Sequence, residues 1–287
     1  MSEWRLIIHG GAKEIAPEEE ADNRDGLVAA IDAGRAVLAE GGSALDAVEA
    51  SVRVLESLPV FNAGRGSDPT VRGQIEMCSA IMDGATLDIG GVMAIQEVCH
   101  PVSVARALLR EDPILLAGEG ATRFARDIGA ELCTLEELKT ADPENESAEL
   151  HDTVGAVAMD SRGDLAAATS TGGLSGQMCG RVGDSPMPGC GYYAENGVGA
   201  VALSGHGEGI ARLRIASKVM HRLNELEPDK AIGDSVNEIG RVGGEAGGVA
   251  IDALGRIGWA HNSPHFAVAH IAEGDNRPAI WLRKQGR

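Results

Sequence analysis

A threonine stands at an abrupt change in the character of the chain. Residues 144–152 (ENESAELHD) are mostly polar and acidic, whereas Thr153 opens an alternating apolar run, TVGAVAMD. If the bond between Asp152 and Thr153 were cut, Thr153 would carry a hydroxyl and a free α-amine with a pKa near neutrality. One residue would then supply both nucleophile and general base. Threonine is also common at the start of a strand, so its position alone does not establish this chemistry.

Other patterns that could do chemistry are incomplete. HGGA at residues 9–12 would suit an oxyanion loop only together with a GxSxG elbow, and the sequence has none. NAGRG and GRVGD match neither of the phosphate-binding glycine patterns. The eight histidines form no HExxH, and a proline interrupts HNSPHF. A phosphate-binding loop and a metal centre are therefore not expected.

The segments around Thr153 would have to hold it on a rigid element. Residues 138–152 combine Pro143 with several acidic side chains, which is typical of an exposed linker, and the run that follows is typical of a buried strand. Strands and helices occur in blocks rather than in strict alternation, which favours an α+β fold. The expected strands cover 4–11, 92–96, 153–159, 164–170, 198–204, 248–252 and 257–261, and the expected helices cover 26–40, 43–57 (with Ser43 at its start), 101–110, 119–128 and 207–224.

The overall composition limits the kinds of partner. The chain has 287 residues, of which 44% are hydrophobic, enough for a sizeable core. Its 43 acidic and 25 basic residues give a net charge of −18, which argues against nucleic-acid binding and could attract a cationic substrate. No apolar run is long enough to span a membrane and the first residues do not form a signal peptide, so a cytoplasmic protein is expected.

The cysteines are expected to be reduced thiols. Their number is odd, they are scattered along the chain and no two form a CxxC motif, which argues against both disulfides and zinc ligands. They are Cys78, Cys99, Cys133, Cys179 and Cys190.

Several motifs together resemble one protein family. TVGAVA at 153–158, TSTGG at 169–173 and GRVGDSP at 180–186 closely resemble motifs of the plant-type asparaginase/isoaspartyl peptidase family of N-terminal-nucleophile hydrolases. The resemblance covers nearly the whole chain, because LIIHGGA, FNAGRGS, IMDGATLDIGGV and GGEAGGVAIDALGRI are similar to further blocks of that family. It implies a four-layer αββα sandwich.

The resemblance implies roles for the residues of these motifs. Thr153 matches the family nucleophile, and Thr171 matches a threonine that orients it. Arg181 and Asp184 match the pair that grips the α-carboxylate and the α-amine of the substrate. The chemistry fits, because a guanidinium pairs with a carboxylate and an aspartate pairs with an ammonium group.

SGHGE at 204–208 is similar to the family's TGTGE segment. The resemblance implies that Ser204 and the Gly205 N–H stabilise the oxyanion and that Gly207 contacts the substrate amine. Asn62 matches an asparagine that assists the cut and supports the site. Ser204 and His206 both replace threonines, and His206 brings a titratable ring to the substrate-binding side, so the leaving group is the least determined part of the substrate.

The same family binds a structural sodium ion through backbone carbonyls of one loop. The resemblance places that loop at residues 55–64, around Leu55, Phe61 and Ala63. It implies no organic cofactor.

The resemblance also implies how the chain is organised and what it hydrolyses. A precursor would cleave itself between Asp152 and Thr153 into parts 1–152 and 153–287, which stay together as one globular unit, and two such pairs would form a dimer. The expected substrates are β-aspartyl dipeptides, with asparagine a weaker one and β-Asp-Arg or β-Asp-Lys from cyanophycin a narrower alternative. Two further alternatives are a glycosylasparaginase and an uncleaved, non-catalytic homologue that acts as a binding protein.

Overall fold

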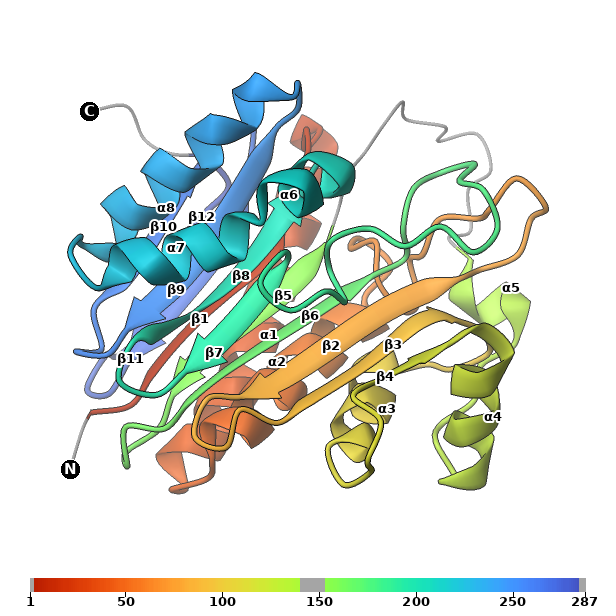
Figure 1. The fold of residues 1–287 in the computed structure, drawn as a ribbon, viewed down its shortest axis with the longest axis horizontal. Coiled ribbons are helices and arrows are strands. Elements are labelled where there is room, and N and C mark those ends of the chain that lie inside the picture. The colour runs from red at the N-terminus through yellow and green to blue at the C-terminus, as the bar shows by residue number, and fades with distance from the viewer. Residues whose placement is uncertain (1–2, 140–152, 284–287) are drawn as a thin grey trace.

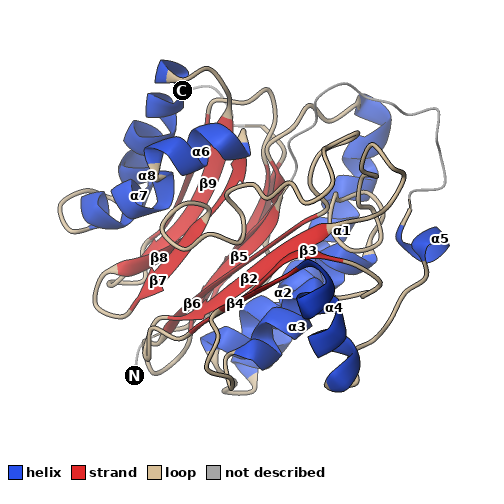
Figure 2. Ribbon diagram, turned by 45° about the vertical axis from the view of Figure 1, so that its right-hand side comes forward, coloured by secondary structure: helices blue, strands red, loops and turns tan. Residues whose placement is uncertain are grey.

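Two β-sheets lie face to face, and helices cover the outer face of each (Figures 1 and 2). This arrangement is seen in a computed structural model of the protein, which describes residues 3–139 and 153–283. The expected α+β class, with two sheets flanked by helices, is confirmed.

The strands of the larger sheet follow the order β12-β11-β1-β5-β6-β2-β3-β4, and those of the smaller sheet the order β10-β9-β8-β7. All neighbours are antiparallel except β3 and β4. The strand bounds are β1 Arg5–Gly11, β2 Met77–Asp83, β3 Ile89–Ile95, β4 Leu115–Ala117, β5 Val154–Met159, β6 Leu165–Thr171, β7 Tyr192–Glu195, β8 Gly199–Gly205, β9 Ala246–Asp252, β10 Ile257–His261, β11 Ala267–Ala272 and β12 Ala279–Trp281.

The helices form the two outer layers (Figure 2). Those before Thr153 cover the larger sheet, and those after it cover the smaller sheet. Their bounds are α1 Glu20–Ala39, α2 Ala44–Ser57, α3 Pro101–Leu108, α4 Gly118–Asp127, α5 Leu135–Leu138, α6 Gly207–Leu213, α7 Ile215–Leu223 and α8 Pro228–Val236, with 3-10 turns at Pro17–Glu19 and Asn237–Arg241.

The strand that follows Thr153 is buried on both faces. Along β5 the side chains alternate between the two cores, because successive residues of a strand point to opposite faces. Ala156 and Ala158 pack toward the helices, whereas Val157 and Met159 pack toward the second sheet. The expected hairpin of β5 and β6 is present, with Val154 opposite Ser170. A residue that immediately precedes β5 is therefore held against a rigid, central part of the fold.

The expected elements are mostly present, with two kinds of difference. Ser43 caps α2 by accepting a hydrogen bond from the Asp46 N–H (3.1 Å), as predicted. The single helix expected over 207–224 is two helices, because Arg214 adopts a left-handed conformation (φ 51°) between them. The short elements β4, α5, β7 and β12, together with β2, β11 and α8, were not among the expected elements. Leu138, the expected start of an exposed linker, is instead the buried last residue of α5.

The prediction that all cysteines are reduced is wrong for two of them. Cys99 and Cys133 form a disulfide with a Cα–Cα distance of 5.1 Å. The backbones meet there because the Cys99 N–H donates to Glu131 O (2.9 Å) and the Cys133 N–H donates to Glu97 O (3.0 Å). This pairing joins segments 34 residues apart, which neither the spacing nor the odd count reveals. The other cysteines are free, as predicted.

We expect the disulfide to stabilise the part of the chain that carries α3 and α4. Closing a loop of this length typically contributes about 2–4 kcal/mol. At one protein concentration, Cys133→Ser should lower the melting temperature by about 5–15 °C, measured by circular dichroism. Cys179→Ser, which removes an exposed free thiol, is the matched control. If a reductant lowers the melting temperature of Cys133→Ser as much as that of the unaltered protein, the disulfide does not provide this stabilisation.

No helix in the two described ranges is both long enough and apolar enough to cross a membrane.

Candidate active site

Thr153 lies immediately before β5, between two serine side chains. Its hydroxyl lies 2.9 Å from the Ser185 hydroxyl, and its backbone N–H donates to Ser204 Oγ over 3.1 Å. Thr153 is only 5% exposed and lines a small cavity. The two atoms that an N-terminal threonine mechanism needs, the hydroxyl oxygen and the backbone nitrogen, are therefore both held by buried partners. Asp152, the other half of the expected cleavage site, lies outside the described residues.

Thr171 lines the same cavity from the end of β6. The pairing of Val154 with Ser170 brings it close to Thr153. Its hydroxyl accepts a hydrogen bond from the Gly173 N–H (3.1 Å), so the side chain also holds the turn that follows the strand.

Asn62 supports this turn from the neighbouring glycine loop. Its side-chain amide donates to Gly173 O (2.9 Å), and its backbone carbonyl accepts from the Gly172 N–H (2.8 Å). A Cβ at residue 172 would lie 2.3 Å from Asn62 Oδ1, so only glycine allows this approach. Asn62 does not line the cavity itself. It holds the turn that lines the cavity.

Arg181 and Asp184 also line the cavity, and Gly207 packs against both. A Cβ on Gly207 would lie 2.8 Å from Asp184 Oδ1 and 3.1 Å from Arg181 Nη2. The absence of a side chain at residue 207 therefore lets a cationic and an anionic group reach the same small space. This arrangement suits a ligand that carries both a carboxylate and an ammonium group.

Asp184 is buried, and its Oδ2 atom has no hydrogen-bond partner among the described residues. Burial raises the pKa of Asp184 to about 7, although Arg181 acts in the opposite direction. An ammonium group bound here would provide the missing partner and favour the ionised carboxylate.

Glu208 holds Arg181 along one edge. Its carboxylate accepts from Arg181 Nε (3.1 Å) and Nη2 (3.0 Å), and this pairing leaves the Nη1 end of the guanidinium for another anion. We expect Glu208→Gln to raise KM about three- to tenfold with little change in kcat, because the guanidinium would be less well oriented while the reacting atoms stay in place. Steady-state kinetics would test this, with Glu225→Gln, an exposed glutamate, as control. An unchanged KM would contradict this role of Glu208.

Ser204 and Gly205 end β8 next to Thr153. Besides the contact with Thr153, Ser204 Oγ accepts a hydrogen bond from the Ala12 N–H (3.0 Å), so the HGGA turn is part of the site. Neither contact uses the proton of the serine hydroxyl. Gly205 lines the cavity with φ 138°, and a Cβ there would lie 2.3 Å from Glu245 O. This backbone conformation is one that a glycine can adopt at the end of the strand.

His206 lies beside the cavity and is not among the residues that line it. Its ring fills the space next to Gly209 and Gly244, where a Cβ would lie 2.8 Å and 2.9 Å, respectively, from His206 Nδ1. The backbone N–H of His206 donates to Glu245 O (2.8 Å). The ring is therefore packed against the start of α6 and the 243–245 turn.

The loop expected to hold sodium is tightly folded around Phe61. The Phe61 carbonyl accepts from the Ala63 N–H (2.9 Å), and the Leu55 carbonyl accepts from the Leu58 N–H (3.4 Å). A Cβ on Gly66 would lie 2.1 Å from Phe61 O and 2.8 Å from Pro59 O, so these two carbonyls turn toward the same point. No three His, Cys, Asp or Glu side chains come together as a metal site within residues 3–139 and 153–283.

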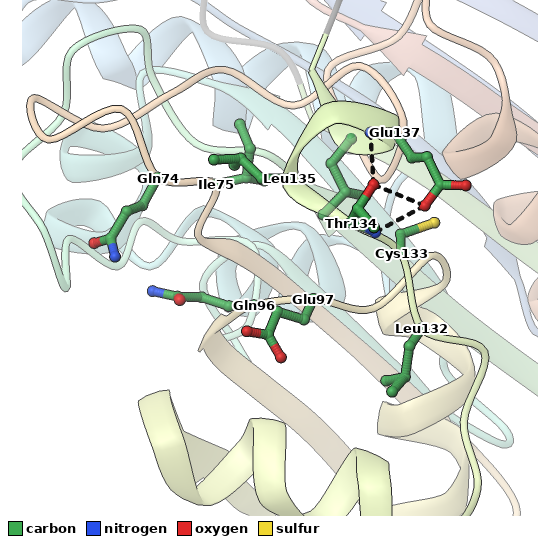
Figure 3. Close-up of a pocket in the computed structure, with 10 residues that line it drawn as sticks. Gln74, Ile75, Gln96, Glu97, Leu132, Cys133, Thr134, Leu135 and Glu137 are labelled. Carbon is green, nitrogen blue, oxygen red and sulfur yellow. Dashed lines mark hydrogen bonds between the residues drawn. The ribbon is translucent and has the colours of Figure 1, made fainter.

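The cavity at Thr153 has a volume of only about 10 Å³, which is room for about one water molecule. Another cavity, of about 450 Å³, lies beside α5 and the disulfide (Figure 3). It shares no lining residue with the cavity at Thr153 and is lined by Gln74, Ile75, Gln96, Glu97, Leu132, Cys133, Thr134, Leu135, Glu137 and Leu138. A choice of site by cavity volume alone would therefore select the larger cavity and miss the candidate residues around Thr153.

The structure adds two residues to those expected from the sequence. Ser185 contacts the Thr153 hydroxyl, and Glu208 holds Arg181. Both belong to quoted motifs, GRVGDSP and SGHGE, so their neighbourhood was recognisable from the sequence. Their particular contacts depend on how two loops meet in space, which the sequence does not display.

Known proteins are similar to this chain over most of its length. A sequence model of the asparaginase family matches residues 2–149 and 133–280. The chain is 41% identical over 267 positions to an isoaspartyl peptidase/L-asparaginase of Xenopus laevis, covering 87% of this chain and 86% of that protein. It is 39% identical over 294 positions to the protein of the same name from Danio rerio, with 92% and 95% covered. It is 38% identical over 307 positions to a plant-type L-asparaginase of Pyrococcus abyssi, with 95% and 98% covered.

Proposed function

Because the chain belongs to the asparaginase family of hydrolases, we propose that it is an isoaspartyl peptidase and L-asparaginase made as a self-cleaving precursor. The cut falls between Asp152 and Thr153. The observation that carries the proposal is the pair of contacts at Thr153, which hold its hydroxyl and its backbone nitrogen beside Arg181 and Asp184. In the proposal the fold is of the N-terminal-nucleophile type, with four layers in the order αββα.

Self-cleavage generates the nucleophile. The Thr153 oxygen attacks the carbonyl carbon of Asp152, the C–N bond breaks, and the hydroxyl proton moves to the nitrogen that becomes the α-amine. Water hydrolyses the resulting ester, which leaves a carboxylate on Asp152 and restores the Thr153 hydroxyl.

In turnover, the uncharged α-amine of Thr153 accepts the hydroxyl proton while the oxygen attacks the side-chain carbonyl of the substrate's aspartyl group. The Ser204 hydroxyl and the Gly205 N–H stabilise the oxyanion, and each such donor is typically worth about 10²–10³ in kcat. The α-amine passes the proton to the leaving amine, and water hydrolyses the acyl-enzyme.

The substrate's α-amino acid head is bound by its two charges. Arg181 pairs with the α-carboxylate, and Asp184 and the Gly207 carbonyl pair with the α-ammonium group. Thr171 orients the nucleophile, and Asn62 holds the turn behind Thr171 and assists the cut. His206 supports the binding side through its packing against α6.

The two fragments stay associated because their strands interleave in one sheet. β1, from the first part, pairs with both β5 and β11 from the second, and β2 pairs with β6. Parts 1–152 and 153–287 thus form one globular unit, and two such pairs form an (αβ)2 assembly. Light scattering after size exclusion should give twice 29.7 kDa.

A sodium ion fits the loop at residues 55–64. The converging carbonyls of Pro59 and Phe61 support this, because a hard cation takes oxygen ligands. Carbonyls around Leu55, Phe61 and Ala63 would hold the ion, which shapes the loop that carries Asn62. No step of the reaction uses it.

A panel of substrates on fully processed protein tests the activity. We expect β-Asp-Leu to be hydrolysed faster than asparagine, and N-terminal sequencing of the active material to find a chain that begins at Thr153. No hydrolysis of any β-aspartyl dipeptide, or activity in uncut protein alone, would overturn the proposal and favour a binding homologue. Faster hydrolysis of N-glycosylated asparagine would favour a glycosylasparaginase instead.

The acidic charge of the chain supports a narrower preference for cationic leaving groups, such as β-Asp-Arg or β-Asp-Lys from cyanophycin. Among the described residues that line the cavity, Asp184 is the one carboxylate, and the α-ammonium group already requires it. Equal kcat/KM for β-Asp-Arg and β-Asp-Leu would exclude the narrower preference.

A further inference from the structure

We propose that Ser185 is the positioning residue that aligns the Thr153 hydroxyl in the uncut chain and so sets the rate of self-cleavage. The inference rests on the proposed function, because it concerns the step that generates the nucleophile.

The contact between the two hydroxyls is short and buried. Thr153 Oγ1 and Ser185 Oγ lie 2.9 Å apart, and both residues are almost fully buried. Either hydroxyl can donate. When Thr153 donates, its oxygen keeps its lone pairs for attack.

Ser185 can direct Thr153 because its own backbone is fixed to the same hairpin. The Ser185 carbonyl accepts a hydrogen bond from Thr169 Oγ1 (2.7 Å), and Thr169 on β6 lies opposite Gly155 on β5. From the other side, a Cβ on Gly191 would lie 2.8 Å from Ser185 Cα, so the loop has no space to shift toward residue 191. The serine and the threonine are thus placed by two neighbouring strands.

The second contact at Thr153 makes the alignment specific. The Thr153 N–H donates to Ser204 Oγ, which holds the backbone nitrogen, and the contact with Ser185 then selects one staggered position of the side chain. A threonine side chain has three such positions, and most of them aim the oxygen elsewhere. Without Ser185 the hydroxyl would be in the attacking position for a smaller part of the time.

The test compares the rates of self-cleavage of purified full-length variants, followed by intact mass. We expect Ser185→Ala to be cut about tenfold more slowly than the unaltered chain, from the loss of one hydrogen bond and one preferred rotamer. Ser185→Thr keeps the hydroxyl and should recover most of the rate. Ser235→Ala removes a buried, hydrogen-bonded serine on α8, away from the site, and should be cut at the unaltered rate.

Melting temperatures separate alignment from a general loss of stability. Ser185→Ala should melt no lower than Ser235→Ala and yet be cut more slowly. The inference is overturned if Ser185→Ala is cut as fast as Ser235→Ala, or if Ser185→Thr is as slow as Ser185→Ala. If Ser185→Ala does not fold, Thr169→Val, which releases the Ser185 backbone, should slow the cut, and an unchanged rate would overturn the inference.

The controls also distinguish a wrong role for Ser185 from a wrong proposed function. If the unaltered chain and Ser235→Ala are never cut at Thr153, the proposed function is wrong. If both are cut and Ser185→Ala matches them, only the role of Ser185 is wrong.

Discussion

Thr153→Ala should remain a single chain of 29.7 kDa and should lose at least about 10⁴-fold of the hydrolytic activity. The substitution removes the oxygen that attacks in both reactions, so the chain is neither cut nor able to form the acyl-enzyme. Intact mass and a denaturing gel after prolonged incubation would follow the first effect, and hydrolysis of a β-aspartyl dipeptide the second.

Two further variants serve as controls for Thr153→Ala. Thr153→Ser keeps a hydroxyl at the same place and should be cut, with lower activity because it lacks the methyl group that limits the rotamers. Thr86→Ala changes an exposed threonine between β2 and β3 and should behave like the unaltered protein. Two fragments from Thr153→Ala would show that the nucleophile is a different residue.

The sequence was sufficient for the parts of the fold that have a strong local pattern. The run at 153–159 predicted β5 and the run at 164–170 predicted β6, because each is largely apolar and is followed within two residues by aspartate or glycine. β7 and β12 were missed because they have only four and three residues. The break at Arg214 was missed because arginine gives no local signal for a left-handed conformation.

The site was predictable to the extent that its residues lie within motifs. Thr153, Thr171, Arg181 and Asp184 were expected and do line one cavity. His206 belongs to such a motif too, and yet its ring packs against Gly209 and Gly244. The direction in which a side chain points depends on neighbours distant in the sequence.

Contacts between residues that are distant in the sequence could not be predicted from sequence patterns. The hydrogen bond from the Ala12 N–H to Ser204 Oγ joins residues 192 positions apart, and the disulfide joins two segments that meet only through their backbones. As an oxyanion loop, HGGA would require a GxSxG elbow, which the sequence lacks. Its actual contribution is a backbone N–H at the candidate site.

Asp184→Asn should raise the KM for β-aspartyl dipeptides about 10- to 100-fold. It should also remove one of the two ionisations on which kcat/KM depends. The increase in KM follows from the loss of a charge-assisted hydrogen bond to the substrate ammonium group. In the free enzyme Asp184 must be ionised, with its pKa raised by burial to about 7, and the Thr153 α-amine must be uncharged, with an ordinary pKa of about 7.7–8.0. Both requirements make kcat/KM rise with pH.

The slope of the profile separates the two groups. In the unaltered enzyme, log kcat/KM should approach a slope of about 2 between pH 5 and 6.5, because two protons must be lost. In Asp184→Asn only the α-amine titrates, so the slope should fall to about 1. Asp234→Asn, which changes an exposed partner of Lys230, should keep the steeper profile. Arg181 and Glu208 are the charged neighbours of Asp184. Burial acts to raise the pKa of Glu208, but the hydrogen bond from Arg181 holds that pKa below its usual value, so Glu208 stays ionised between pH 5 and 6.5. A slope of 1 in the unaltered enzyme would mean that Asp184 is already ionised without substrate, and that the ammonium group does not meet a protonated carboxyl when it binds.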